Sequence, residues 1–101
     1  MEVNITKKGD ENVVELVGRL DTPSAQEVSK ALTPLQDKAS ETIVLDCSKL
    51  SYISSSGLRI FLGLRKAAAV KGGKVIVRKI GQEIRNVFMI TGFLNLFDIE
   101  D

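Results

Sequence analysis

Residues 42–64 read TIVLDCSKLSYISSSGLRIFLGL, a stretch in which three serines and a glycine separate two apolar segments. Its first part, Thr42–Cys47, is a mostly apolar run typical of a buried central strand, which we expect to be covered on both sides. The sequence from Gly57 to Lys71 is apolar nearly all round, as expected for a helix wedged against a sheet. The serine row Ser54–Ser56 therefore lies where a buried strand passes into a helix.

On the amino-terminal side, the sequence predicts a β-hairpin. Val3 and Ile5 alternate with polar residues, as in a half-buried strand. A turn at residues 7–12 leads to a second apolar run over Val13–Val17. We expect these two strands to pair antiparallel.

A helix is predicted to follow the hairpin, over the segment DTPSAQEVSKAL at residues 21–32. Thr22 can cap it, and Pro23 suits the first helical position, which needs no amide hydrogen. Pro34 removes a backbone hydrogen bond and clashes one turn back, so we expect a kink or an end near Thr33. Residues at helical spacing form one apolar face: Ala25, Val28, Leu32 and Leu35.

The carboxyl-terminal part continues the alternation of strands and helices. Gly72 and Gly73 favour the end of the helix that follows the serine row. A strand over Lys74–Arg78, a helix over residues 82–92 and a short strand over residues 96–100 are predicted next. The sequence therefore predicts an α/β fold with one domain, residues 1–101: a mixed β-sheet of four to five strands, an N-terminal hairpin and helices packed against the sheet.

Composition excludes several classes of function. The 14 Lys and Arg residues nearly balance 13 Asp and Glu residues, so charge gives no reason to expect nucleic acid or an anionic membrane as partner. The amino terminus lacks the apolar core of a signal peptide, and no apolar run reaches the ~20 residues of a membrane span. The only cysteine, Cys47, is expected in the core, and one thiol fits a reducing, cytoplasmic location.

The chain contains no histidine. This absence removes the usual general base for a serine nucleophile and the commonest zinc ligand. A pairing of serine with lysine remains open as a route to hydrolysis. The sequence favours a protein that is not an enzyme and that needs neither a metal ion nor a cofactor.

The serine row itself allows three interpretations: a nucleophile, a helix cap, or a site of modification. In α/β sheets, binding sites gather at the carboxyl ends of strands, where this row lies. The first amides of the helix favour a negative group there. Capping explains one of the three serines, whereas a phosphate on another would add about −1.5 to −2 charges.

Three segments together resemble a known family. GRLDTPSAQEV at residues 18–28, TIVLDCSKLSYISSSGLRIFLGL at residues 42–64 and GGKVIVRKIGQEIRNVFMITGFLNLFDI at residues 72–99 look like a STAS domain of the bacterial anti-sigma factor antagonist type. The resemblance covers nearly the whole chain. It implies a STAS fold and a phosphorylation-controlled partner-switching protein that acts in transcription regulation and stress response.

The resemblance also implies a modification site. The family motif usually reads Asp-Ser-Ser-Gly or Asp-Ser-Thr-Gly, with the phosphoacceptor directly after the Asp. Aligned on Gly57, the acceptor is Ser55, with Ser56 and Ser54 as second choices. Ser54 stands where the family has its Asp, which is a departure from the motif.

The implied partners are an anti-sigma factor with serine kinase activity, which binds the unphosphorylated protein, and a metal-dependent serine phosphatase. In an alternative reading, the domain docks a partner without phosphorylation. The residues expected to form the partner-binding surface are Asp21, Tyr52, Ser54, Ser55, Ser56, Gly57 and Arg59.

Overall fold

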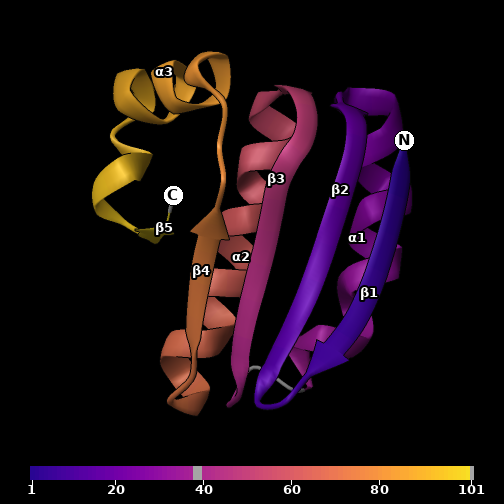
Figure 1. The fold of residues 1–101 in the computed structure, drawn as a ribbon, viewed down its shortest axis with the longest axis vertical. Helices are drawn as coiled ribbons and strands as arrows, with labels where there is room; N and C mark the ends of the chain where they lie inside the picture. Colours follow the sequence, from indigo (N-terminus) through magenta and orange to yellow (C-terminus); the bar gives the residue numbers. More distant parts are fainter. Residues whose placement is uncertain (38–39, 101) are drawn as a thin grey trace.

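A five-stranded sheet in the order β1-β2-β3-β4-β5 is the frame of the fold (Figure 1). The computed structural model describes residues 1–37 and 40–100. β1 is antiparallel to β2, and the other neighbouring strands are parallel, which confirms the predicted mixed sheet with an N-terminal hairpin. The strands are β1 (Glu2–Lys8), β2 (Glu11–Leu20), β3 (Thr42–Ile53), β4 (Lys74–Arg78) and β5 (Asp98–Glu100).

Two helices cover one face of this sheet. α1 (Thr22–Gln36) and α2 (Ser55–Lys71) both lie behind the strands in Figure 1, and each leaves the carboxyl end of a strand. α3 (Gln82–Thr91) and the short 3-10 helix η1 (Phe93–Asn95) complete the core, because Phe88 packs edge-to-face on Phe61 of α2 with ring centroids 6.1 Å apart. In the described part of the chain, no helix combines the length and the apolar character needed to cross a membrane.

The central strand β3 is covered by helices on one face, so the expectation of cover on both faces is wrong. Side chains alternate along a strand; Ile43 and Leu45 belong to the core, whereas Val44 lies outside that cluster. Val44 is nevertheless 0% exposed, and the residues paired with it on the neighbouring strands are Val13 and Ile76. Charged side chains form ion pairs on the open face: Lys49–Glu15, Arg78–Glu11 and Arg78–Glu100.

β2 and β3 run further than their apolar segments predict. The pairing of the two strands shifts register twice, between Glu15 and Val17 and between Gly18 and Arg19. Gly18 has φ +104°, a conformation that other residues rarely adopt. These bulges let the more polar end of β3 stay paired as far as Ile53.

α1 differs from its prediction at both ends. Asp21, not Thr22, is its N-cap, and the helix continues through Pro34 to Gln36. Pro34 stands in the exposed last turn and costs the helix the hydrogen bond that its amide would donate to the Lys30 carbonyl. The turn is held nevertheless by Leu32 and Leu35, which are buried in the core. The helix end is supported from α2, since Lys71 Nζ donates to the Gln36 carbonyl at 2.8 Å.

α2 is buried along one face only. Its buried residues are Gly57, Leu58, Phe61, Leu64 and Ala68, whereas Val70 is 85% exposed. Gly63, by contrast, is not required by packing, because a Cβ added there would have nothing within 4 Å. The helix ends as predicted at Gly72, with φ +80°.

Candidate functional site

The serine row lies at the edge of the sheet where two parallel strands end together. Leu20, the last residue of β2, pairs with Ile53, the last residue of β3. The next residues, Asp21 and Ser54, are the N-caps of α1 and α2. The Ser54 amide donates to the Leu20 carbonyl at 2.8 Å. The two helix starts are therefore neighbours, at the top of Figure 1.

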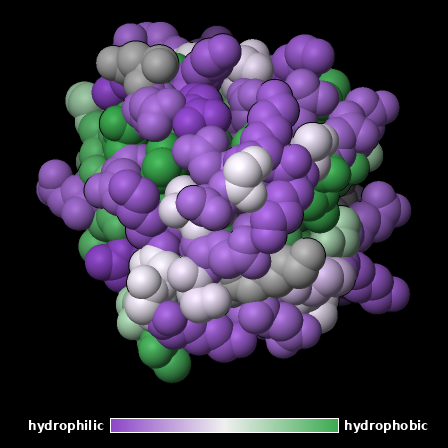
Figure 2. All heavy atoms as spheres, turned by 60° about the horizontal axis from the view of Figure 1, so that its bottom comes forward, coloured by the Kyte–Doolittle hydropathy of each residue, from purple (hydrophilic) through white to green (hydrophobic). Residues whose placement is uncertain are grey.

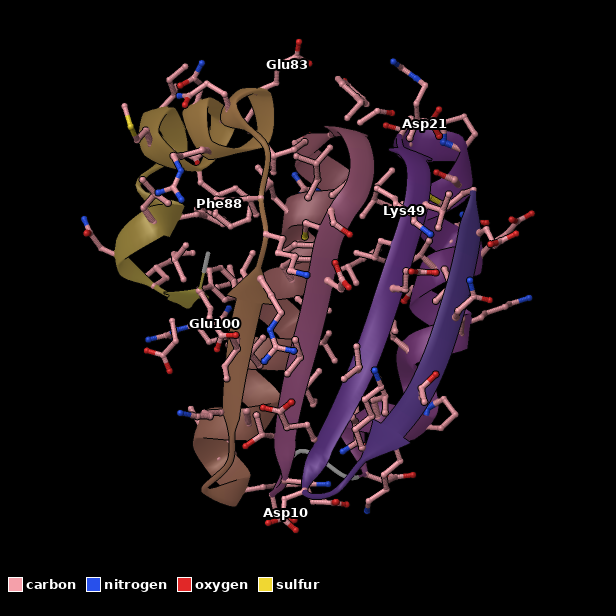
Figure 3. The ribbon with its side chains drawn as sticks, in the orientation of Figure 1. Asp10, Asp21, Lys49, Glu83, Phe88 and Glu100 are labelled. Atoms are coloured by element: carbon pink, nitrogen blue, oxygen red, sulfur yellow. The ribbon has the colours of Figure 1, made fainter. Side chains whose placement is uncertain are left out.

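Asp21 is held firmly at the start of α1. Its Oδ1 accepts hydrogen bonds from the Ser24 amide at 3.0 Å and from the Ser24 hydroxyl at 2.8 Å, while its own amide donates to Ser24 Oγ. The bonds from Ser24 lower the pKa of the Asp21 carboxyl below its ordinary value. Figure 3 shows Asp21 at the end of the molecule opposite Asp10. A fixed carboxylate thus stands beside the serine row.

Ser54 caps α2. It has extended backbone angles, and its hydroxyl accepts a hydrogen bond from the Gly57 amide at 3.2 Å. Its carbonyl accepts the first intrahelical bond, from the Leu58 amide at 2.9 Å. The capping interpretation is therefore confirmed for one serine, and this serine is Ser54.

Ser55, the first residue of α2, is exposed to solvent. In residues 1–37 and 40–100, no side chain or backbone group hydrogen-bonds to its hydroxyl. A serine nucleophile needs a neighbouring base, and no base among the described residues hydrogen-bonds to Ser55. Ser56 is half-buried, so Ser55 is the most accessible hydroxyl of the row.

Gly57 lets α2 start close to the sheet. A Cβ at this position would lie 2.7 Å from Cγ of Leu20 and 2.9 Å from Cγ1 of Ile53. Both side chains are in the core. Glycine is thus required by the packing of α2 against the ends of β2 and β3, and Gly57 takes part in the site by positioning the serine row.

Tyr52 and Arg19 lie on paired positions of β3 and β2 beside the row. The Arg19 guanidinium stacks over the Tyr52 ring, with Cζ 4.3 Å from the centroid. Tyr52 remains 39% exposed, so the stacked pair offers an aromatic and charged surface to a partner. A hollow of about 420 Å³, lined by Arg19, Asp21 and Glu27 among others, adjoins this pair.

The structure therefore brings most of the predicted surface together. Asp21 follows the end of β2, and Tyr52 lies at the end of β3, just before the serine row. Gly57 is buried beneath the row. Arg59 is exposed one turn further along α2. Sequence reasoning missed Arg19, because its position beside Tyr52 depends on the bulges between β2 and β3. In Figure 2 the opposite end comes forward, and hydrophilic side chains cover most of the surface it shows.

Comparison with known families and proteins gives consistent matches. The model of the STAS domain family matches residues 2–101. The anti-sigma-B factor antagonist of Bacillus subtilis is 29% identical in an alignment of 102 positions, which covers 98% of this chain and 92% of that protein. BtrV of Bordetella bronchiseptica, which carries the name of an anti-sigma factor antagonist, is 33% identical over 84 residues, 83% of this chain and 72% of its own length.

Solved structures show the same fold. SpoIIAA, described as an anti-sigma factor antagonist, matches in its unphosphorylated form with a TM-score of 0.76 at 20% identity, over 99% of this chain and 88% of that one. The phosphorylated form of SpoIIAA from Bacillus matches with a TM-score of 0.74 at 20% identity, over 97% of this chain and 90% of its own. The five-stranded mixed sheet with its N-terminal hairpin and three helices is thus a known arrangement.

Proposed function

Because the chain belongs to the STAS domain family and to its anti-sigma factor antagonists, we propose that it is a partner-switching regulator controlled by phosphorylation of Ser55. Unphosphorylated, it binds an anti-sigma factor that is also a serine kinase, and so frees a sigma factor. Phosphorylated, it dissociates from that partner. The protein itself is not an enzyme, acts in the cytoplasm and requires no cofactor.

The observation that carries this proposal is the division of roles within the serine row. Ser54 uses its hydroxyl to cap α2, whereas the neighbouring Ser55 hydroxyl is exposed and has no partner within the described residues. Because the Ser55 hydroxyl does not cap the helix, it can be modified without loss of the helix cap. Its position at the amino end of α2 also suits a dianion, because amides and the helix dipole favour negative charge there.

The chemistry is a phosphoryl transfer carried out by the partner. The γ-phosphoryl group of ATP passes to Ser55 Oγ, ADP leaves, and the serine proton goes to a base of the kinase. A metal-dependent phosphatase then hydrolyses the phosphoester, which restores the hydroxyl and releases inorganic phosphate. SpoIIAA is known in both phosphorylated and unphosphorylated forms, and this precedent supports such a cycle.

The departure from the family motif is compatible with this cycle. Ser54 stands where the motif carries aspartate, and serine and aspartate are comparably good N-cap residues. The replacement therefore keeps the cap, as the bond from the Gly57 amide to Ser54 Oγ indicates. It also removes one negative charge beside the hydroxyl that receives the phosphate.

An assay of sigma-factor release tests the proposed function. The unmodified chain, added to a purified complex of the cognate sigma factor and anti-sigma factor without ATP, is expected to displace the sigma factor in proportion to its concentration. Size-exclusion chromatography separates the resulting species. A Tyr52→Ala variant changes an exposed side chain and keeps the core intact, and it should displace less sigma factor than the parent chain. A complex that remains intact at excess unmodified chain would exclude the antagonist role.

A further inference from the structure

We propose that Arg59 binds the phosphate group of phosphorylated Ser55 within the same chain. This inference rests on the proposed function, since it concerns the modified state of the same site. The family motif ends at Gly57 and does not include position 59, so it requires no arginine there. The inference follows from the place of Arg59 on α2 and from the partners of the other arginines.

The geometry of the helix brings the two side chains together. Ser55 and Arg59 are four residues apart in α2, so they are neighbours on one face of the helix. The Cα–Cβ bonds of a helix lean toward its amino end, so the Arg59 side chain starts toward the turn that carries Ser55 and can reach it. In the unphosphorylated chain Arg59 lines a hollow between α1 and α2 together with Gln36. The anion precedes the cation along the chain, which is the favourable order for such a pair.

Arg59 is also available for this role. In the described part of the chain its guanidinium forms no hydrogen bond, ion pair or ring contact, and the side chain is exposed. Other arginines are engaged: Arg19 stacks on Tyr52, Arg65 donates to the Leu96 carbonyl, and Arg78 pairs with Glu100. A flat guanidinium can direct two parallel N–H groups at two phosphate oxygens at once.

Two other charged groups stand near the phosphate. Asp21 caps the neighbouring helix and repels an anion, whereas Arg19 is a cation stacked beside the row. Both act equally on the phosphate whether or not Arg59 is present. The contribution of Arg59 can therefore be isolated by substitution. Its expected effect is to stabilise the dianion, and thus to keep the phosphate doubly charged at neutral pH.

Phosphorus-31 NMR measures this effect directly. Phosphoserine is incorporated at position 55 during translation, which needs no kinase, and the phosphorus shift is followed against pH in low salt. The second phosphate pKa, ordinarily about 6, is expected to be higher in Arg59→Ala than in the parent by about 0.3 of a pH unit or more. Arg59→Lys should give a smaller rise, because lysine keeps the charge and loses the paired donors.

A matched control removes a positive charge elsewhere on the same helix. Lys66 is exposed and lies three turns beyond Ser55, so Lys66→Ala should leave the phosphate pKa at the parent value. An equal pKa in the parent and in Arg59→Ala would overturn the inference. An equal rise in Lys66→Ala and Arg59→Ala would also overturn it, because the effect would then be one of net charge. Neither result bears on whether a kinase modifies Ser55, which is measured separately.

Discussion

Phosphorylation of Ser55 is expected to weaken the binding of the anti-sigma factor by about two to three orders of magnitude. The phosphate adds about −1.5 to −2 charges at the exposed start of α2, beside the carboxylate that caps α1. Like charge forced into an interface costs several kcal/mol, and about 1.4 kcal/mol corresponds to a tenfold change in affinity. Isothermal titration calorimetry of the unmodified chain and of the chain with phosphoserine at position 55 gives both affinities.

The control for this measurement carries phosphoserine at Ser40. Ser40 is exposed and lies shortly before Thr42, the first residue of β3, at the opposite end of the sheet. The chain with phosphoserine at position 40 should bind the anti-sigma factor as tightly as the unmodified chain. Equal affinities for the unmodified chain and the chain phosphorylated at Ser55 would contradict the switch and support a docking module that works without phosphate.

Gly57→Ala is expected to lower the free energy of unfolding by about 1 to 3 kcal/mol. The added Cβ would come within 3 Å of Leu20 and Ile53, which are buried at the strand ends and have little room to move. Urea denaturation followed by circular dichroism measures the change. The substitution should also weaken the partner complex, because α2 and Ser55 would be pushed away from the sheet.

Gly63→Ala is the matched control in the same helix. A Cβ at Gly63 meets nothing within 4 Å, so the substitution should stabilise the protein by about 0.5 to 1 kcal/mol through helix propensity alone. The change from glycine to alanine should therefore lower the free energy of unfolding at position 57 and raise it at position 63. Destabilisation of the same size at both positions would show that Gly57 has no special packing role.

The order of the elements was predictable because each carries a local pattern. Alternation marks β1, apolar runs mark β2, β3 and β4, and the glycines after α2 and α3 mark helix ends. The length of β3 was not predictable. Its last part contains the exposed residues Ser48, Lys49 and Ser51, which look like a loop, and only pairing with β2 across two bulges keeps it in the sheet.

The candidate site was predictable only in part, because some of its features depend on local sequence and others on tertiary structure. The position of the serine row at a strand-to-helix junction follows from sequence, and so does the expectation of one capping serine. Which residue caps a helix depends on backbone angles, and these favour Asp21 over Thr22 in α1 and Ser54 in α2. The stacking of Arg19 on Tyr52 depends on strand register, which no local pattern encodes.

The most direct measurement locates the phosphate itself. The chain and its Ser55→Ala and Ser56→Ala variants are incubated with the cognate anti-sigma factor kinase and ATP, and phosphopeptides are sequenced by mass spectrometry. One phosphate is expected on Ser55 in the parent and in Ser56→Ala, and none in Ser55→Ala. Labelling of Ser55→Ala as strong as that of the parent would contradict the assignment of Ser55 as the acceptor.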